Sequence, residues 1–391
     1  MSMCGKSRGL RNLKDRIAQE IATSGPMTFA HFMEVALYDQ EAGYYAAGRA
    51  KIGRRGDFYT SVSVGPIFGE ILASQFLEMW EHLGRPADFT LVEQGANDGR
   101  LAADIRAALQ ATPLHDVRYI FVEPSATLRQ EQRTKVAAGD WVDKVEDLPD
   151  FVGVHFSNEL FDALPFHLAE SDGETWQELF VSGSADDLTF TRGNPSPDIV
   201  DVLHRYPLPE PGRLVEIRVS HQSLLAAISR KLQHGFLLMI DYGMSTEVRM
   251  APHRSRGTFA CFKDHRRDDF PLQDVGEKDI TAHVDFSEFL RDASAVGFDV
   301  VGFNDQHHFL VGAAEELLRA MDGQPQTAES QKRLRQLQTL LHPETMGRNF
   351  HAVALSRNLA TPPSLRGFRY GNKVLANGEL INRQMTSLPE G

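Results

Sequence analysis

Cysteine is scarce in this chain: Cys4 and Cys261 are the two cysteines among 391 residues. Two thiols so far apart provide neither a disulfide framework nor a four-ligand zinc site, and such usage is typical of a reducing compartment. Long apolar runs are also missing, since none could span a bilayer. We therefore expect no disulfide-rich secreted domain, no membrane span and no metal site.

The N-terminus lacks the apolar segment of a secretory signal, although it carries basic residues between Lys6 and Arg16. That charge raises the alternative of an organellar transit peptide. Asp15 and Glu20 interrupt the basic run, however, and apolar residues recur there at helix spacing. We interpret the segment as an amphipathic helix and expect a cytoplasmic protein.

Positive charge is in deficit, because 41 Lys and Arg stand against 53 Asp and Glu, for a net charge of −12. A nucleic-acid-binding domain normally presents a basic surface, so we expect neither DNA nor RNA as a partner. The acidic balance suits simple solubility first. It also suits a small cationic ligand or a protein partner that presents arginine or lysine.

What the chain does contain is an alternation of short apolar runs with amphipathic stretches. The apolar runs start at Phe89, Arg118, Val152, Gly235, Phe298 and His308. Runs that are continuous rather than alternating indicate strands buried on both faces, as in a sheet covered by helices on both sides. We predict a doubly wound, Rossmann-like α/β fold that is mostly parallel and has an antiparallel last strand.

The same pattern suggests how the chain is divided. We expect an N-terminal helical segment over residues 1–84, a core over 85–357 and a loop-like C-terminal tail over 358–391. Residues 165–234 and 244–285 interrupt the alternation within the core. Because loops that follow core strands build the binding sites of α/β sheets, we interpret both as insertions that shape a substrate cleft.

The first chemical signal is the run VEQGANDG at residues 92–99, which follows one predicted strand and opens a predicted helix. Glycines there allow a tight turn and close approach of the backbone to a ligand. An acid at the end of the next strand can accept hydrogen bonds from both ribose hydroxyls of a nucleoside. The loop lacks G-x-G-x-x-G spacing and instead has the usual pattern of an S-adenosylmethionine loop. We predict that this ligand is bound by Glu93, Gly95, Asn97, Gly99 and Glu123.

Further motifs resemble those of one family. They are GDFYTS at 56–61, EQGANDG at 93–99, VEPS at 122–125, SNELFDALP at 157–165, IDYG at 240–243 and TAHVDF at 281–286. Together they are similar to the MidA family, which includes a mitochondrial arginine methyltransferase of complex I assembly. The resemblance covers about residues 20–357.

The resemblance implies a methyltransferase that uses S-adenosylmethionine and methylates arginine in a partner protein, such as a respiratory complex subunit. It also leaves a homodimer open. An ordinary helix cap is the alternative role for the 56–61 loop. The residues that the resemblance adds to the cofactor site are Gly56, Asp57, Thr60, Ser61, Pro124 and Asn158.

Two positions depart from the family pattern. Asn97 stands where the family usually has glycine, and since Asn tolerates left-handed backbone angles, we expect the turn to survive. Ser63 stands where the family usually has a glutamate. If that glutamate touches the acceptor, the protein uses another acceptor or none.

The acceptor chemistry points to carboxylates. A guanidinium keeps its proton in water, and two carboxylates can grip it bidentately. Glu159 and Asp162 are three residues apart just after a core strand, so one turn of helix would place them on the same side. We predict that they position the acceptor, with a solvated Glu159 and a helix-capping Asp162 as the alternative. His283 is a further catalytic candidate as a general base.

Three hypotheses therefore remain open: an arginine methyltransferase, a small-molecule methyltransferase with a closed pocket, and a cofactor-binding assembly factor without catalysis. The Ser63 departure favours the last two slightly.

Overall fold

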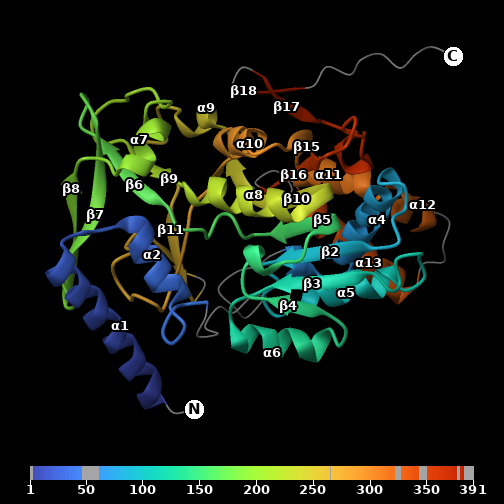
Figure 1. Cartoon of the computed structure of the whole chain (residues 1–391), viewed down its shortest axis with the longest axis horizontal. Coiled ribbons are helices and arrows are strands. Elements are labelled where there is room, and N and C mark those ends of the chain that lie inside the picture. The colour runs from blue at the N-terminus through green and yellow to red at the C-terminus, as the bar shows by residue number, and fades with distance from the viewer. Residues whose placement is uncertain are drawn as a thin grey trace.

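The computed structural model describes residues 3–45, 61–264, 266–321, 327–342, 350–376 and 379–382 (Figure 1). Two lobes lie side by side: a core lobe built on the large sheet and an outer lobe that contains the first two helices. Among the described helices, none is both long and apolar enough to cross a membrane.

The core sheet has the strand order β18-β17-β15-β16-β10-β5-β2-β3-β4. Its central strands are β2 (Phe89–Gln94), β3 (Arg118–Val122), β4 (Asp140–Val142), β5 (Phe151–Asn158) and β10 (Leu232–Met244). These five pair in parallel. β16 (Phe350–Arg357) runs antiparallel between β10 and β15 (Asp299–Asp305). The prediction of a mostly parallel doubly wound sheet with an antiparallel last strand is confirmed.

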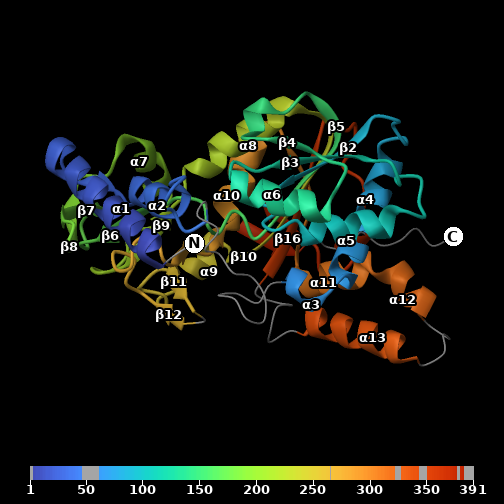
Figure 2. The same ribbon diagram turned by 90° about the horizontal axis from the view of Figure 1, so that it is seen from below.

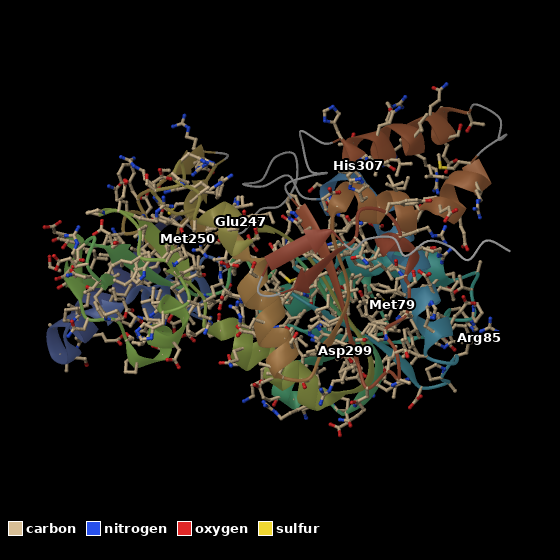
Figure 3. All side chains as sticks on the ribbon, turned by 90° about the horizontal axis from the view of Figure 1, so that it is seen from above. Met79, Arg85, Glu247, Met250, Asp299 and His307 are labelled. Atoms are coloured by element: carbon tan, nitrogen blue, oxygen red, sulfur yellow. The ribbon has the colours of Figure 1, made fainter. Side chains whose placement is uncertain are left out.

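Helices cover both faces of this sheet, which explains the continuous apolar strands. One face packs against α3 (Ser61–Val64), α4 (Ile67–His82), α5 (Arg100–Leu109), α11 (Gln306–Ala313), α12 (Glu315–Met321) and α13 (Ala328–Leu341). The other packs against η1 (Val145–Asp147), α8 (Ser220–Lys231) and α10 (Phe286–Ala295). α6 (Ala126–Lys135) follows β3. Met79 lies wholly inside the first of these layers (Figure 3).

The apolar run that starts at His308 is helix α11, so its prediction as a strand is wrong. The Asp305 side chain accepts a hydrogen bond from the His308 backbone N–H at 2.9 Å, which caps the helix. Short buried helices and strands share the same apolar pattern, and the cap decides here.

The tail, expected to be loop-like, contains regular structure in its described part. It has η3 (Arg366–Phe368), β17 (Lys373–Ala376) and β18 (Glu379–Asn382). β17 pairs with β15 at Phe303 and with β18, so this hairpin extends the edge of the core sheet.

The outer lobe combines three stretches that are far apart in sequence (Figures 1 and 2). The N-terminal stretch supplies α1 (Met3–Ser24), β1 (Met27–Thr28) and α2 (Phe29–Tyr38). The first insertion supplies β6 (His167–Ser171), β7 (Trp176–Ser184), β8 (Asp187–Gly193), α7 (Pro197–Leu203) and β9 (Leu214–Ile217). The second supplies α9 (Thr246–Arg249), β11 (Ala260–Lys263), β12 (Arg266–Asp268) and β13 (Asp279–Thr281). β14 (Val284–Asp285), which ends this insertion, instead pairs in parallel with β10 of the core sheet.

These stretches share one apolar cluster, in which Phe29 and Phe32 of α2 pack with Phe166, Val181 and Ile280. β1 also pairs antiparallel with β7 in the sheet order β1-β7-β6-β9. The N-terminal segment therefore contributes to both lobes, since α1 and α2 belong to the outer lobe whereas α3 and α4 cover the core sheet. Met250, just after α9, packs against a second outer-lobe cluster (Figure 3).

Candidate active site

A cavity of about 400 Å³ opens between the carboxyl ends of β2, β3 and β5 and the outer lobe. This is the edge at which open α/β sheets bind ligands. The cavity brings together most of the predicted residues that the structure describes, namely Glu93, Gly95, Asn97, Glu123, Pro124, Asn158, Glu159 and Asp162. Gly99 lies just outside its lining, at the start of α5. Gly56, Asp57 and Thr60 lie outside the described residues.

The loop after β2 has the tight geometry that its glycines predict. Gly95 and Gly99 have φ angles of 77° and 79°. A Cβ atom at Gly95 would lie 3.1 Å from Leu160 Cδ1. Asn97 has a φ of 45°, so the expectation that it keeps the left-handed turn is confirmed. The loop thus exposes backbone to the cavity immediately before the N-terminus of α5.

Glu123 and Glu93 are buried, hydrogen-bonded carboxyl groups. Glu123 accepts hydrogen bonds from the Ser125 backbone N–H at 2.9 Å and from Gln132 Nε2 at 3.2 Å. Burial raises its pKa to about 6. Glu93 accepts a hydrogen bond from the Tyr119 hydroxyl, and burial raises its pKa to about 7. Both side chains are held in place by the core before any ligand arrives.

The loop after β5 is fixed by a single carboxylate. Asp241 Oδ2 accepts backbone N–H bonds from Leu160, Phe161 and Asp162 at 3.2, 2.8 and 3.3 Å. Glu159 is left with a φ of 54°, which is a strained angle for glutamate. The predicted helical turn over residues 159–162 is absent, because these backbone N–H groups bond to Asp241 instead of to earlier carbonyls.

This loop presents buried polar atoms to the cavity. Asn158 Nδ2 donates to Glu159 Oε1 at 3.0 Å, and the Tyr242 hydroxyl donates to Asp162 Oδ2. Within the described part of the chain, Asn158 Oδ1 and Asp162 Oδ1 are buried without a hydrogen-bond partner. Buried polar atoms are normally paired, so these two point to a ligand.

Burial dominates the protonation of the two acids. Burial, followed by the nearby Asp162 carboxylate, raises the pKa of Glu159 to about 8, against the lowering effect of the Asn158 amide and the Ser61 backbone N–H. The pKa of Asp162 is raised as well, chiefly by burial. Ser61 therefore lies beside Glu159, and its hydroxyl donates to Gln306 Oε1 at 3.0 Å.

His283 does not line the cavity. Its ring centroid lies 5.2 Å from that of Tyr242, so Tyr242 separates it from Asp162. Burial lowers its pKa to about 4, which keeps the ring neutral near pH 7. The structure thus places this predicted base against Tyr242 and outside the lining of the cavity.

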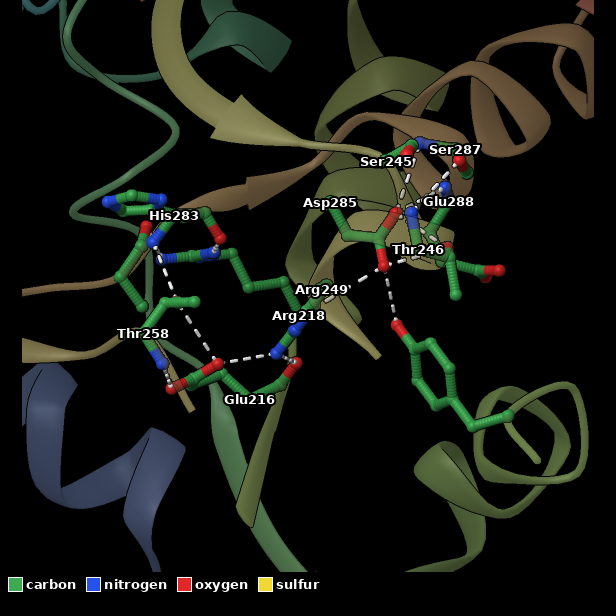
Figure 4. A network of polar contacts seen from close by, with 12 residues as sticks. Glu216, Arg218, Ser245, Thr246, Arg249, Thr258, His283, Asp285, Ser287 and Glu288 are labelled. Atoms are coloured by element: carbon green, nitrogen blue, oxygen red, sulfur yellow. Dashed lines mark hydrogen bonds and ion pairs between the residues drawn. The ribbon is translucent and has the colours of Figure 1, made fainter. Parts of the chain in front are cut away.

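Arg218 ties the loop after β5 to the second insertion. Figure 4 shows it in a polar network with Glu216, Arg249 and His283. Its Nη2 donates to the carbonyls of Asp162 and Ala282 at 2.5 and 2.6 Å, and its Nη1 donates to that of His283 at 3.0 Å. Behind it, Glu216 and Arg249 form a buried ion pair at 2.5 Å. Because these groups come from distant segments, no local sequence pattern indicates the network.

Tyr38, Tyr45, Tyr242 and Asp279 are among the lining residues that the sequence did not assign to the site. Tyr242 belongs to the IDYG motif, which was a usable signal. The other three come from the outer lobe and carry no motif that links them to this site.

No group of three His, Cys, Asp or Glu side chains suited to a metal ion occurs in the described ranges. His307 Nδ1 bonds instead to the Leu341 carbonyl at 2.8 Å (Figure 3). The His308 ring bonds to Asp305 at 2.7 Å.

The sheet, the glycine loop and the carboxyl group at the end of β3 define the class: this protein is an S-adenosylmethionine-dependent methyltransferase. Residues 71–304 match the profile of a family described as S-adenosyl-L-methionine-dependent methyltransferase, and the chain belongs to that family.

The relatives agree with this assignment and with the resemblance seen in the motifs. A crystal structure from Burkholderia thailandensis, bound to S-adenosyl-homocysteine, is 28% identical with a TM-score of 0.84, and the match covers 95% of this chain and 98% of that chain. The human protein arginine methyltransferase NDUFAF7, mitochondrial, is 29% identical over 86% of this chain and 81% of its own length. Its homologue from Drosophila melanogaster is 29% identical over 71% of this chain and 69% of its own length. The predicted cofactor is confirmed.

The expectation of a cytoplasmic protein is contradicted, because the human and Drosophila relatives are named as mitochondrial. Cysteine usage reports the redox state of a compartment rather than its identity. The composition on which the expectation rested therefore could not distinguish one reducing compartment from another.

Proposed function

We propose that this methyltransferase transfers the methyl group to an arginine side chain of a partner protein. The observation that carries the proposal is a pair of carboxyl groups that line the cavity after β5, the half-buried Glu159 and the buried Asp162. The unpartnered Asp162 Oδ1 and Asn158 Oδ1 are acceptors, and a guanidinium consists of N–H donors only. The names of the human and Drosophila relatives support the same substrate class.

The charge of the cavity supports a cationic acceptor. Its carboxyl side chains are Glu93, Asp98, Glu123, Asp143, Glu146, Glu159, Asp162 and Asp279, and Lys144 is the one basic side chain among the described lining residues. Such an excess attracts cations and repels anionic substrates. Both the sulfonium of the cofactor and a guanidinium fit this environment.

Each residue has a distinct part in the proposal. When bound, S-adenosylmethionine supplies an electrophilic methyl group on its sulfonium. Glu123 holds the ribose at the end of β3. Glu159 and Asp162 orient the guanidinium so that one nitrogen faces the methyl carbon, since proximity and orientation supply most of such a rate. The Glu159 carboxylate is placed to take the proton that the methylated nitrogen releases.

His283 acts in this proposal as a positioning residue, because its ring packs against Tyr242, whose hydroxyl donates to Asp162. A cofactor role for Asp57, Thr60 and Ser61 remains a prediction, as do a respiratory complex subunit as the partner and a homodimer as the oligomeric state.

The test uses the purified protein with deuterium-labelled methyl S-adenosylmethionine and tryptic peptides from a mitochondrial extract. Mass spectrometry should find the labelled methyl group on arginine. The matched control, Glu159→Gln, should retain affinity for S-adenosylhomocysteine by calorimetry and lose peptide labelling.

Other outcomes separate the alternatives. Labelled metabolites with unlabelled peptides would favour a small-molecule methyltransferase. Binding of S-adenosylhomocysteine without any labelled product, from peptides or from metabolites, would favour an assembly factor that binds cofactor but does not catalyse.

A further inference from the structure

We propose that Tyr38, Tyr45 and Asp279 of the outer lobe form one wall of the acceptor subsite, which we call the outer wall. This wall makes the subsite selective for a flat guanidinium over an ammonium. This inference rests on the proposed function and assigns residues that the core motifs do not include.

The two tyrosines form a stacked aromatic pair in the lining of the cavity. Tyr38 ends α2 and Tyr45 follows it, and their ring centroids are 5.5 Å apart with an interplanar angle of 19°. The Tyr38 hydroxyl donates to the Ala163 carbonyl at 2.9 Å, and the Tyr45 hydroxyl donates to Asp279 Oδ1 at 2.8 Å. Since both hydroxyls are bonded to protein, the rings offer a ligand their apolar surface.

Asp279 adds a third carboxyl group to the acceptor side. It lies at the start of β13 with 2% of its surface exposed, and its Oδ1 also accepts the Ile280 backbone N–H at 2.9 Å. Burial is the main cause that raises the pKa of Tyr38 and of Tyr45, and the nearby Asp279 and Asp162 carboxylates add to it. The aromatic pair therefore lies near carboxyl groups of both lobes.

The two lobes are joined at this place by direct bonds. Tyr38 bonds to Ala163 from the outer-lobe side, and the Ala282 backbone N–H donates to the Asp162 carbonyl at 3.1 Å. Arg218 holds the same two carbonyls, those of Asp162 and Ala282, as described above. The outer wall is therefore positioned relative to Glu159 and Asp162 by protein contacts.

The chemistry of this wall distinguishes the two biological cations. A guanidinium is planar, stacks on aromatic faces and presents a fork of N–H donors to carboxylates. An ammonium is a compact, strongly hydrated point charge that gains less from a stacked pair of rings. A wall of aromatic rings and a carboxylate is the arrangement that favours the planar cation.

The test uses three adenosine derivatives whose 5′ position carries an alkyl arm ending in a guanidine, an amine or a urea of matched length. Calorimetry gives their dissociation constants, with S-adenosylhomocysteine as the reference for the cofactor half. We expect wild-type protein to bind the guanidine arm about tenfold or more tightly than either of the other arms.

The variants then assign the preference to the outer wall. In Asp279→Asn and in Tyr38→Ala, we expect the guanidine preference to fall about tenfold, while affinity for S-adenosylhomocysteine stays within about twofold, as it should when the contacts are additive. Tyr45→Phe keeps the ring and loses the hydrogen bond to Asp279, so it should lose part of the guanidine preference. This milder variant provides the test if Asp279→Asn or Tyr38→Ala fails to fold. Asp187→Asn, an exposed acid of the same lobe, is the control and should behave as wild type.

The outcomes separate this inference from the proposed function. If wild-type protein binds S-adenosylhomocysteine and shows no preference for the guanidine arm, the arginine proposal fails and this inference fails with it. If wild type prefers the guanidine and all three variants keep that preference, the outer wall does not select the acceptor, and the arginine proposal stands without it.

Discussion

The cavity has a cofactor end, formed by Glu93 and Glu123, and a proposed acceptor end, formed by Asn158, Glu159 and Asp162. The two ends differ in how many of their polar atoms are already hydrogen-bonded within the protein. At the cofactor end, Glu123 already accepts two hydrogen bonds and Glu93 bonds to Tyr119. At the acceptor end, Asp162 Oδ1 and Asn158 Oδ1 have no partner among the described residues, and Glu159 has a positive φ. The carboxyl groups of the cofactor end are hydrogen-bonded within the protein, whereas the acceptor end has a strained backbone angle and two unpaired acceptor atoms.

Under the proposed function, this contrast predicts that specificity resides in the acceptor end. A satisfied site can bind its ligand without rearrangement, which suits a cofactor shared by many enzymes. An unsatisfied buried site penalises every ligand that cannot supply the missing donors, so it discriminates strongly. Changes at the two ends should accordingly alter different measurements.

The largest effect should come from Glu159→Gln, which keeps the shape of the side chain but cannot form the carboxylate that pairs with the guanidinium in the proposal. Removing one partner of a buried charge pair costs about 2–5 kcal/mol, so kcat/KM for an arginine peptide should fall from about 30-fold to several thousandfold. Affinity for S-adenosylhomocysteine should stay near wild type. Glu131→Gln, an exposed acid on α6, is the control, and equal losses in both variants would remove the case for an acceptor role.

Glu123→Ala should show the opposite pattern. Losing the hydrogen bonds of a buried carboxyl group costs about 1–3 kcal/mol, so calorimetry should find S-adenosylmethionine bound about 5- to 150-fold more weakly. The guanidine-over-urea preference of the adenosine derivatives should be retained. Unchanged cofactor affinity in a folded Glu123→Ala protein would contradict the ribose role.

The pH dependence should come from the acceptor end. The pKa of Glu159 is raised to about 8, so the free protein carries a neutral acid below that pH and a carboxylate above it. Since only the carboxylate grips a cation, and the guanidinium keeps its proton throughout, kcat/KM should rise about tenfold per pH unit up to about pH 8 and then level off.

Two variants test that assignment. Glu159→Gln should lose the rising limb near pH 8. Glu93→Gln removes the carboxyl group whose pKa is about 7 and should keep that limb. A limb that survives in Glu159→Gln would belong to another group.

The cofactor end could be predicted from sequence because its residues directly follow predicted strands in the chain. The loop at 95–99 and Glu123 each follow a strand directly, and the carboxyl ends of neighbouring parallel strands necessarily meet. The acceptor end could be predicted only in part. Glu159 and Asp162 follow β5, but the structure replaces the expected helical turn with N–H bonds to Asp241, 79 or more residues away.

The outer wall could not be predicted at all, for the same reason. Tyr38 and Asp279 belong to segments more than 200 residues apart in sequence, and only the packing of α2 against both insertions brings them together. The helix at His308 shows the same limit on a smaller scale, because its apolar pattern fits both helix and strand and the Asp305 cap decides.

The smallest effect should come from Asn97→Gly, at the cofactor end. Asn97 already adopts a φ of 45°, which glycine adopts without strain, while glycine loses more chain entropy on folding by about 0.5–1 kcal/mol. The relief of backbone strain and the loss of chain entropy therefore oppose each other. The hydrogen bond from Gln132 Nε2 to the Asn97 carbonyl, 2.8 Å in the present chain, involves the backbone and should be kept. Thermal unfolding should shift by no more than a few degrees, and affinity for S-adenosylhomocysteine should change by less than about twofold. A large loss of affinity would mean that the Asn97 amide itself binds the cofactor, and the cofactor end would then resemble the acceptor end in relying on a ligand to complete its hydrogen bonds.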